Sequence, residues 1–93
     1  MTKPYIRSGM DEEGRAWVEV EDTELYDFVE DFLTEDHDLE HLWVGTHDEP
    51  GRATCYTMVF EGDLLPRIRT ALALIDAERI HEIYLINNPD RAE

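Results

Sequence analysis

Residues 16–51 read AWVEVEDTELYDFVEDFLTEDHDLEHLWVGTHDEPG, and this stretch decides both the expected fold and the charge of the chain. It holds thirteen Asp and Glu and no Lys or Arg, so it carries −13 of the formal net charge of −15. The other residues hold ten acids and eight bases. A surface of one sign attracts the opposite charge and repels nucleic acid and anionic membranes. The stretch therefore favours a basic partner and disfavours direct binding to nucleic acid or membrane.

Within this stretch, the apolar pattern predicts a strand followed by a helix. Residues 15–21 alternate between apolar and polar side chains, which is typical of a half-buried strand. Asp22 and Thr23 supply an N-cap, and Glu24 lies in the first turn, where the helix dipole favours an anion. Five apolar residues then recur at helical spacing: Leu25, Phe28, Val29, Phe32 and Leu33. They predict one apolar stripe on a helix that ends near residue 35 or 36.

The following residues predict a hairpin, a second helix and a last strand. Residues 39–46 and 53–61 are expected to form two strands, joined by a turn at 48–51. Asp63 is expected to cap the second helix. The buried side of that helix is predicted to contain Leu65, Ile68, Ala71, Leu72 and Ile75. Residues 79–87 are rich in branched apolar side chains, and we expect them to form the final strand.

This order of elements predicts an α+β fold of the ferredoxin-like βαββαβ type, an antiparallel sheet with two helices on one face. Leu25, Phe28 and Phe32 of the first helix, and Ile68, Leu72 and Ile75 of the second, are expected to face the sheet. The 93 residues make a single domain. Within the N-terminal segment, residues 1–14, we expect an extra edge strand at 5–8. Residues 89–93 are expected to be a tail.

Cysteine usage and hydropathy indicate the compartment. The single cysteine, Cys55, excludes an internal disulfide and fits a reducing environment. The N-terminal residues contain no apolar segment of the kind found in signal peptides. No run approaches the 18 apolar residues of a membrane-spanning helix. We therefore expect a cytoplasmic protein.

The outer side of the first predicted helix carries Glu24, Asp27, Glu30, Asp31 and Glu35. The eleven steps from Glu24 to Glu35, at 1.5 Å each, span roughly 16 Å, so the five carboxylates recur about every 4 Å. This spacing is near the about 3.4 Å between phosphates of one nucleic-acid strand. No Lys or Arg stands four residues away to pair with them. We expect the following residues to bind a partner: Glu19, Glu21, Asp22, Glu24, Asp27, Glu30, Asp31, Glu35, Asp36, Asp38 and Glu40.

A small, strongly acidic single domain with rows of carboxylates across residues 16–51 resembles the nucleic-acid-mimic inhibitor proteins. That group includes phage anti-CRISPR proteins and the immunity proteins that block bacterial nucleases. The resemblance lies in size and charge layout, and no motif specific to either group is present. It implies an inhibitor that occupies the basic nucleic-acid site of its partner, such as an effector complex or a nuclease. Because these proteins have many unrelated folds, it implies no particular fold.

The histidines offer a second interpretation, a small metal-binding enzyme. His37 and His41 are four residues apart, beside Asp38 and Glu40, and would share a helix face if the helix continued to residue 41. Asp38 stands where a metalloprotease signature has its Glu, and the apolar stripe already stops at Leu33. The chain also lacks a Gly-rich phosphate loop. We therefore expect a surface histidine pair, no metal, no cofactor and no enzymatic activity.

The aromatic residues offer a third interpretation, a homodimeric regulatory domain. The sheet face opposite the helices is expected to gather Trp17, Trp43, Tyr56 and Tyr84. In RNA-recognition modules of this topology, aromatics on that face stack on bases beside basic residues. Here Glu19 and Glu21 stand beside them, which disfavours RNA. We expect this face to be covered instead by a second copy, by a partner or by the N-terminal segment.

Adaptation to high salt is an alternative explanation of the charge. The single lysine, Lys3, is compatible with it. Such adaptation is expected to spread acids over the whole surface, whereas here they concentrate in one stretch.

Overall fold

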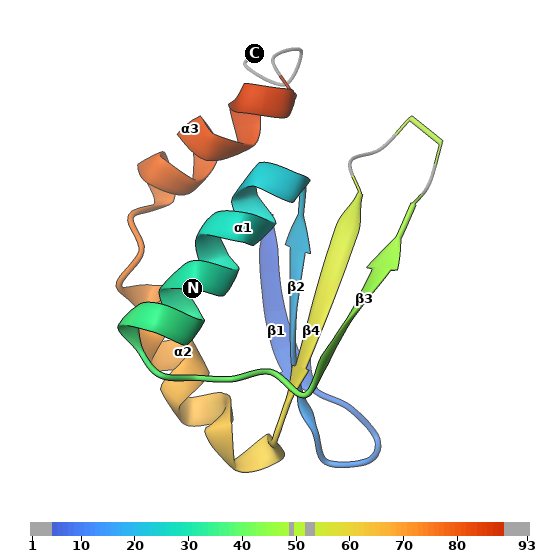
Figure 1. The fold of residues 1–93 in the computed structure, drawn as a ribbon, viewed down its shortest axis with the longest axis vertical. Coiled ribbons are helices and arrows are strands. Elements are labelled where there is room, and N and C mark those ends of the chain that lie inside the picture. Colours follow the sequence, from blue (N-terminus) through green and yellow to red (C-terminus); the bar gives the residue numbers. More distant parts are fainter. Residues whose placement is uncertain (1–4, 49, 52–53, 89–93) are drawn as a thin grey trace.

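The computed structural model describes residues 5–48, 50–51 and 54–88, and it shows an α+β fold (Figure 1). The elements in chain order are β1 (Ile6–Met10), β2 (Ala16–Glu21), α1 (Thr23–Asp31), the π-helix η1 (Phe32–Asp36), β3 (Trp43–His47), β4 (Cys55–Phe60), the 3₁₀-helix η2 (Gly62–Leu64), α2 (Leu65–Ala73) and α3 (Ala77–Asn87). The strands form one sheet in the order β1-β2-β4-β3, and every neighbouring pair is antiparallel. The tail expected at 89–93 lies outside the described residues.

The first half of the expected topology is confirmed. The chain passes from β2 through α1 to β3 and then returns as β4, which pairs between β2 and β3. The expected N-terminal edge strand is also present, as β1, and pairs with β2. In a ferredoxin-like sheet, the last strand would occupy this place beside β2. Because β1 occupies it, the ferredoxin-like order is not confirmed.

The prediction of a strand at 79–87 was wrong, because these residues lie in α3. The carboxylate of Asp76 caps this helix by accepting the N–H of Glu78, at 3.2 Å. Ile80, Ile83 and Tyr84 follow at helical spacing and are buried. The sequence contained both signals, a capping Asp and an i, i+3, i+4 stripe. The β-branched residues of the segment concealed them.

One face of the sheet forms the core with the helices, and Figure 1 shows all three helices on the same side. In β2, Ala16, Val18 and Val20 are fully buried on this face. In β4, Phe60 pairs with Ala16 and Met58 pairs with Val18, and both are also fully buried. A third helix therefore covers the sheet, where two were expected.

The buried side of α1 differs from the expected one. Leu25, Val29 and Leu33, spaced four apart, are fully buried. Phe28 and Phe32 are only partly buried and pack at the margin of the core. The ring of Phe28 lies 6.0 Å from the guanidinium of Arg79, on α3. The stripe therefore centres on the aliphatic residues, and Phe28 and Phe32, which were expected to face the sheet, pack only at the edge of the core.

The second helix contains the expected core residues but begins differently. Its core-facing residues Ile68 and Leu72 are buried, and so is Ile75, which lies two residues after the end of the helix. The predicted cap Asp63 instead lies inside η2, and α2 begins after Leu64 without a side-chain cap. The 3₁₀ turn of η2 leads directly into the first turn of α2, so the cap position moves past Asp63. No helix of the described chain is long and apolar enough to cross a membrane.

Candidate partner-binding surface

The turn between β2 and α1 is built around Asp22, which is 4% exposed. One carboxylate oxygen accepts the N–H groups of Glu24 and Leu25, at 3.1 and 3.2 Å. The other accepts the side-chain amide of Asn88, at 3.0 Å. Asp22 was expected to contact a partner, but its carboxylate is buried and already bonded. Its role in the structure is to fix the start of α1.

Four exposed carboxylates follow along the outer side of α1 and η1: Glu24, Asp27, Asp31 and Glu35. We call these four residues the acidic row. The residues after it, Asp36, Asp38 and Glu40, are exposed as well. None of the ion pairs recorded among the described residues involves the row. The structure thus places seven of the expected contact residues on one exposed stretch of chain.

Glu30 belongs to the same helix but is half-buried. Its carboxylate accepts the hydroxyl of Thr34, one turn further on, at 3.0 Å. The carboxylate is therefore partly satisfied within the helix and lies beside the acidic row rather than in it.

Glu19 and Glu21 lie apart from the acidic row. Side chains alternate along β2, and those of Ala16, Val18 and Val20 point toward the helices. The side chains of Glu19 and Glu21 therefore point to the opposite face of the sheet. Arg7 on β1 bridges the two carboxylates, with its Nε 2.7 Å from Glu19 and its Nη1 3.0 Å from Glu21. The bond to Glu19, more than that to Glu21, raises the pKa of Arg7. Both acids are paired on the open sheet face.

The helix ends where the sequence indicated, before His41. Asp38 adopts a left-handed conformation with φ 55°, and the N–H of Leu39 donates to the carbonyl of Leu33 at 2.8 Å. This geometry stops the helix, as left-handed residues commonly do after a C-cap. His37 lies against Phe32, while His41 lies edge-on to Phe60. Within the described ranges, no group of three or more potential ligands is arranged to hold a metal ion.

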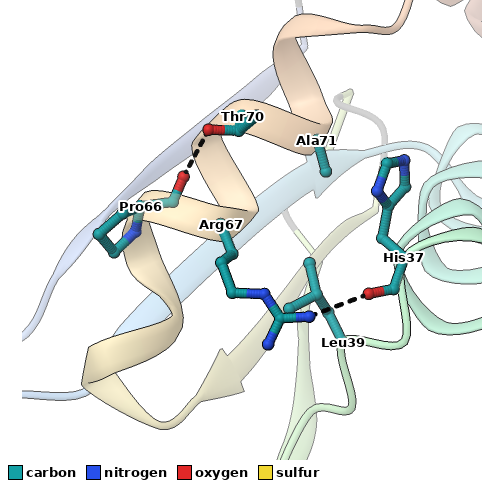
Figure 2. A pocket seen from close by; sticks show the side chains of 6 residues that line it. All are labelled: His37, Leu39, Pro66, Arg67, Thr70 and Ala71. Atoms are coloured by element: carbon teal, nitrogen blue, oxygen red, sulfur yellow. Dashed lines mark hydrogen bonds between the residues drawn. The ribbon is translucent and has the colours of Figure 1, made fainter.

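A hollow of about 290 Å³ lies between the end of η1 and α2 (Figure 2). Its lining residues are His37, Leu39, Pro66, Arg67, Thr70 and Ala71. The guanidinium of Arg67 points to the carbonyl of His37, at 3.4 Å, and the hydroxyl of Thr70 donates to the carbonyl of Pro66, at 3.0 Å. The guanidinium of Arg67 and the hydroxyl of Thr70 are thus both bonded to backbone carbonyls within the fold.

The expected aromatic cluster is divided between two faces. Trp17 and Trp43 do lie on the open face, on either side of Val59 in the register. Tyr56 pairs with Val20 on the helix side and stacks on Tyr26 of α1, with centroids 4.4 Å apart. Tyr84 lies in α3 and is 2% exposed. The prediction for the two tyrosines was wrong.

On the open face, each tryptophan rests against a residue of the first hairpin. The ring of Trp17 lies over Gly9, where an added Cβ would be 2.8 Å from Cζ2. The guanidinium of Arg15 lies 5.1 Å from the centroid of the Trp43 ring. Glycine at position 9 therefore permits the tryptophan to pack on β1.

Comparisons with protein-family models, with curated proteins and with solved structures found no match to this chain. Function is therefore inferred from the residues themselves. Besides the acidic row, the structure exposes a feature that sequence reasoning missed, the outer edge of β3. A strand pattern is visible in the sequence, but its place at the sheet edge follows only from the order β1-β2-β4-β3.

Proposed function

We propose that this chain is a non-enzymatic binding protein that occupies the nucleic-acid site of a basic partner. The acidic row carries the proposal. Its four carboxylates are exposed along one side of a continuous helix and have no recorded ion pair among the described residues. Asp36, Asp38 and Glu40 extend the exposed negative charge beyond the helix.

The rigidity of the helix supports this proposal. Carboxylates on a helix keep fixed spacings, at about 1.5 Å of rise per residue, so a row of them can match a row of phosphate-binding Lys and Arg. Electrostatic complementarity of this kind accelerates encounter and selects the partner more than it adds affinity. η1 further supports a functional surface, because π-helices are rare and frequently occur at functional sites.

The test begins with affinity capture from cells that contain the chain. The wild-type chain is compared with the row variant, in which Glu24, Asp27 and Asp31 are each changed to Lys. A protein retained only by the wild-type chain is purified, and its binding to nucleic acid is measured at rising concentrations of the chain. We expect competitive displacement of the nucleic acid, because both ligands would need the same cationic groups. Binding of both at once would contradict the proposal.

A control variant with the same net charge as the row variant tests whether the position of the carboxylates matters. The control variant changes Glu12, Glu61 and Glu82 to Lys, all of them exposed and outside the row. Both variants change the net charge from −15 to −9, because each substitution adds two charges. The control variant should still displace the nucleic acid, and the row variant should not.

A homodimeric domain is the second candidate function. It is favoured by the open face of the sheet, where Trp43 is 49% exposed beside Val59 and Trp17. Sedimentation at low and high salt tests it. A dimer that is lost in Trp43→Ser would support this function, whereas a monomer at both salt concentrations would contradict it.

A further inference from the structure

The edge strand β3 has an open outer edge. It pairs only with β4 among the described strands, and Figure 1 shows nothing beside its other edge. All five of its residues are exposed. Trp43, on the open face, is 49% exposed, and Val44, on the helix side beside Met58, is 39% exposed. The helix layer therefore stops short of β3, and on the open face the guanidinium of Arg15 lies over the Trp43 ring, at 5.1 Å from its centroid.

This edge lacks the features with which proteins usually prevent strand pairing. Edge strands are commonly protected by charged side chains, by Pro or by a β-bulge. β3 reads Trp-Val-Gly-Thr-His and pairs with β4 in unbroken register. At its centre is Gly45, around which a Cβ would meet nothing within 4 Å. Glycine at such a position permits another backbone to approach closely.

The charges around β3 indicate which kind of strand would pair with it. Exposed carboxylates stand at both ends, at Glu40 before the strand and at Asp48 after it. The chain as a whole carries −15. A second copy pairing antiparallel about Gly45 would bring the end of β3 that follows Glu40 in one copy toward the end that precedes Asp48 in the other. Like charges would thus meet at both ends, whereas a basic strand would meet opposite charges.

We propose that β3 is a strand-addition site for an extended basic segment of a partner protein. The segment would pair its backbone with the free edge of β3 and place its Lys or Arg side chains near Glu40 and Asp48. Backbone hydrogen bonds supply affinity in this mode of recognition, and side-chain pockets supply specificity. The inference rests on the proposed function, since it specifies how the basic partner engages the acidic chain. It adds a backbone contact that the acidic row alone does not require.

The test uses synthetic peptides of alternating lysine and valine. About nine residues are needed, because a strand advances about 3.4 Å per residue and the peptide must reach from Glu40 to Asp48. A matched peptide carries N-methyl groups on alternate residues, which remove backbone donors without changing the charge. Amide hydrogen exchange of the full chain is followed with each peptide. We expect the unmodified peptide to slow exchange within Trp43–His47 at least fivefold and the methylated peptide to leave it unchanged.

Two variants locate the contact on the chain. Gly45→Lys places a cation on the edge and should weaken binding of the unmodified peptide at least fivefold. Leu74→Lys is the control, since Leu74 is 67% exposed at the end of α2 and the added charge is the same. Gly45→Val keeps the edge neutral and should bind the peptide more strongly than Gly45→Lys does, which separates the added charge from the loss of the glycine.

Several outcomes would overturn the inference. Equal binding of the methylated peptide, with exchange slowed only in α1 and η1, would show that the acidic row alone attracts it. The proposed function would survive that result, and strand addition would not. Absence of peptide binding, or a dimer joined through β3, would also contradict the inference. A different result would contradict the proposed function alone: the peptide slows amide exchange at β3, but the chain does not displace nucleic acid from its partner.

Discussion

Asp22, a single residue that the sequence predicted to contact a partner, instead stabilises the fold. Its backbone has φ 88° and ψ 141°, a conformation that residues other than glycine rarely adopt. Its N–H donates to the carbonyl of Thr54 at 2.7 Å, and its carbonyl accepts the N–H of Tyr26 at 2.9 Å. Together with the bond from Asn88, these contacts connect β2, α1 and the end of α3. Such a residue is held by its surroundings and is not free to bind a partner.

The first prediction concerns this residue. Asp22→Ala removes the cap of α1 and the acceptor of Asn88, and should lower the free energy of unfolding by about 2–3 kcal/mol. Asp22→Asn is the control, because its amide oxygen can still cap the helix, and it should cost less. Urea titration followed by circular dichroism measures both. An alanine variant as stable as the wild type would contradict the assignment of Asp22 as a structural hub.

The second prediction concerns Tyr26, whose pKa is raised above 10.0 by partial burial first, and then by the charges of Glu30 and Asp27. The folded protein thus disfavours the phenolate, and the unfolded chain ionises first as the pH rises. The contribution of Tyr26 to stability is therefore complete below pH 10 and is lost as the pH rises through the folded pKa.

Urea titrations of the wild type and Tyr26→Phe at rising alkaline pH measure this effect. We expect the wild type to lose stability relative to the variant above pH 10, because phenylalanine does not ionise. A constant difference between the two proteins would contradict the raised pKa.

At the scale of elements, α1 and the η1 turn that continues it are held by aliphatic residues spaced four apart, Leu25, Val29 and Leu33. Leu33→Ala should cost about 2–5 kcal/mol, since Leu33 is fully buried and a cavity would remain. Phe28→Ala should cost clearly less, because Phe28 only borders the core. Denaturant titration ranks the two. The reverse order would show that the helix is rotated relative to the described packing.

Local patterns in the sequence were sufficient for the type and order of the elements up to β4, although the strand expected at 39–46 begins only at Trp43. The alternation of Val18 and Val20, the Asp22 cap and the turn ending at Gly51 are each short-range signals, and each predicted its element correctly. The segment 79–87 was misassigned because β-branched residues such as Ile80 and Ile83 also fit a strand, which concealed the Asp76 cap and the helical stripe. In the structure this segment packs against Tyr5, near the N-terminal end of the described chain. The rings of Tyr5 and Tyr84 stack with their centroids 3.7 Å apart. Long-range contact of this kind leaves no local signal.

In the candidate site, too, local sequence patterns predicted some features and missed others. The exposure of the acidic row follows from helical spacing and was predictable. The pairing of Glu19 and Glu21 with Arg7 depends on the β1–β2 register, in which Arg7 lies opposite Glu19. The exposure of β3 depends on sheet order. Neither register nor order can be read from one strand's sequence, so the paired acids and the open edge were missed.

At the scale of the whole molecule, a net charge of −15 on 93 residues destabilises the fold through self-repulsion. Added salt screens this repulsion within a Debye length of about 8 Å at physiological ionic strength. We expect the free energy of unfolding to rise with salt, and to rise less for the row variant than for the control variant of equal net charge. Equal salt responses would favour adaptation of the whole surface to high salt. Urea titration at several salt concentrations measures the difference.

The central claim is that the acidic row, and not the total charge, binds the basic partner. Single exposed contacts contribute only about 0.2–1 kcal/mol, so the decisive change is the simultaneous reversal of Glu24, Asp27 and Asp31. The most direct measurement is the affinity of the purified partner for the wild type, the row variant and the control variant at low and high salt. We predict that the wild type and the control bind more weakly as salt rises, and that the folded row variant fails to bind. A folded row variant with wild-type affinity and wild-type salt dependence would contradict the claim.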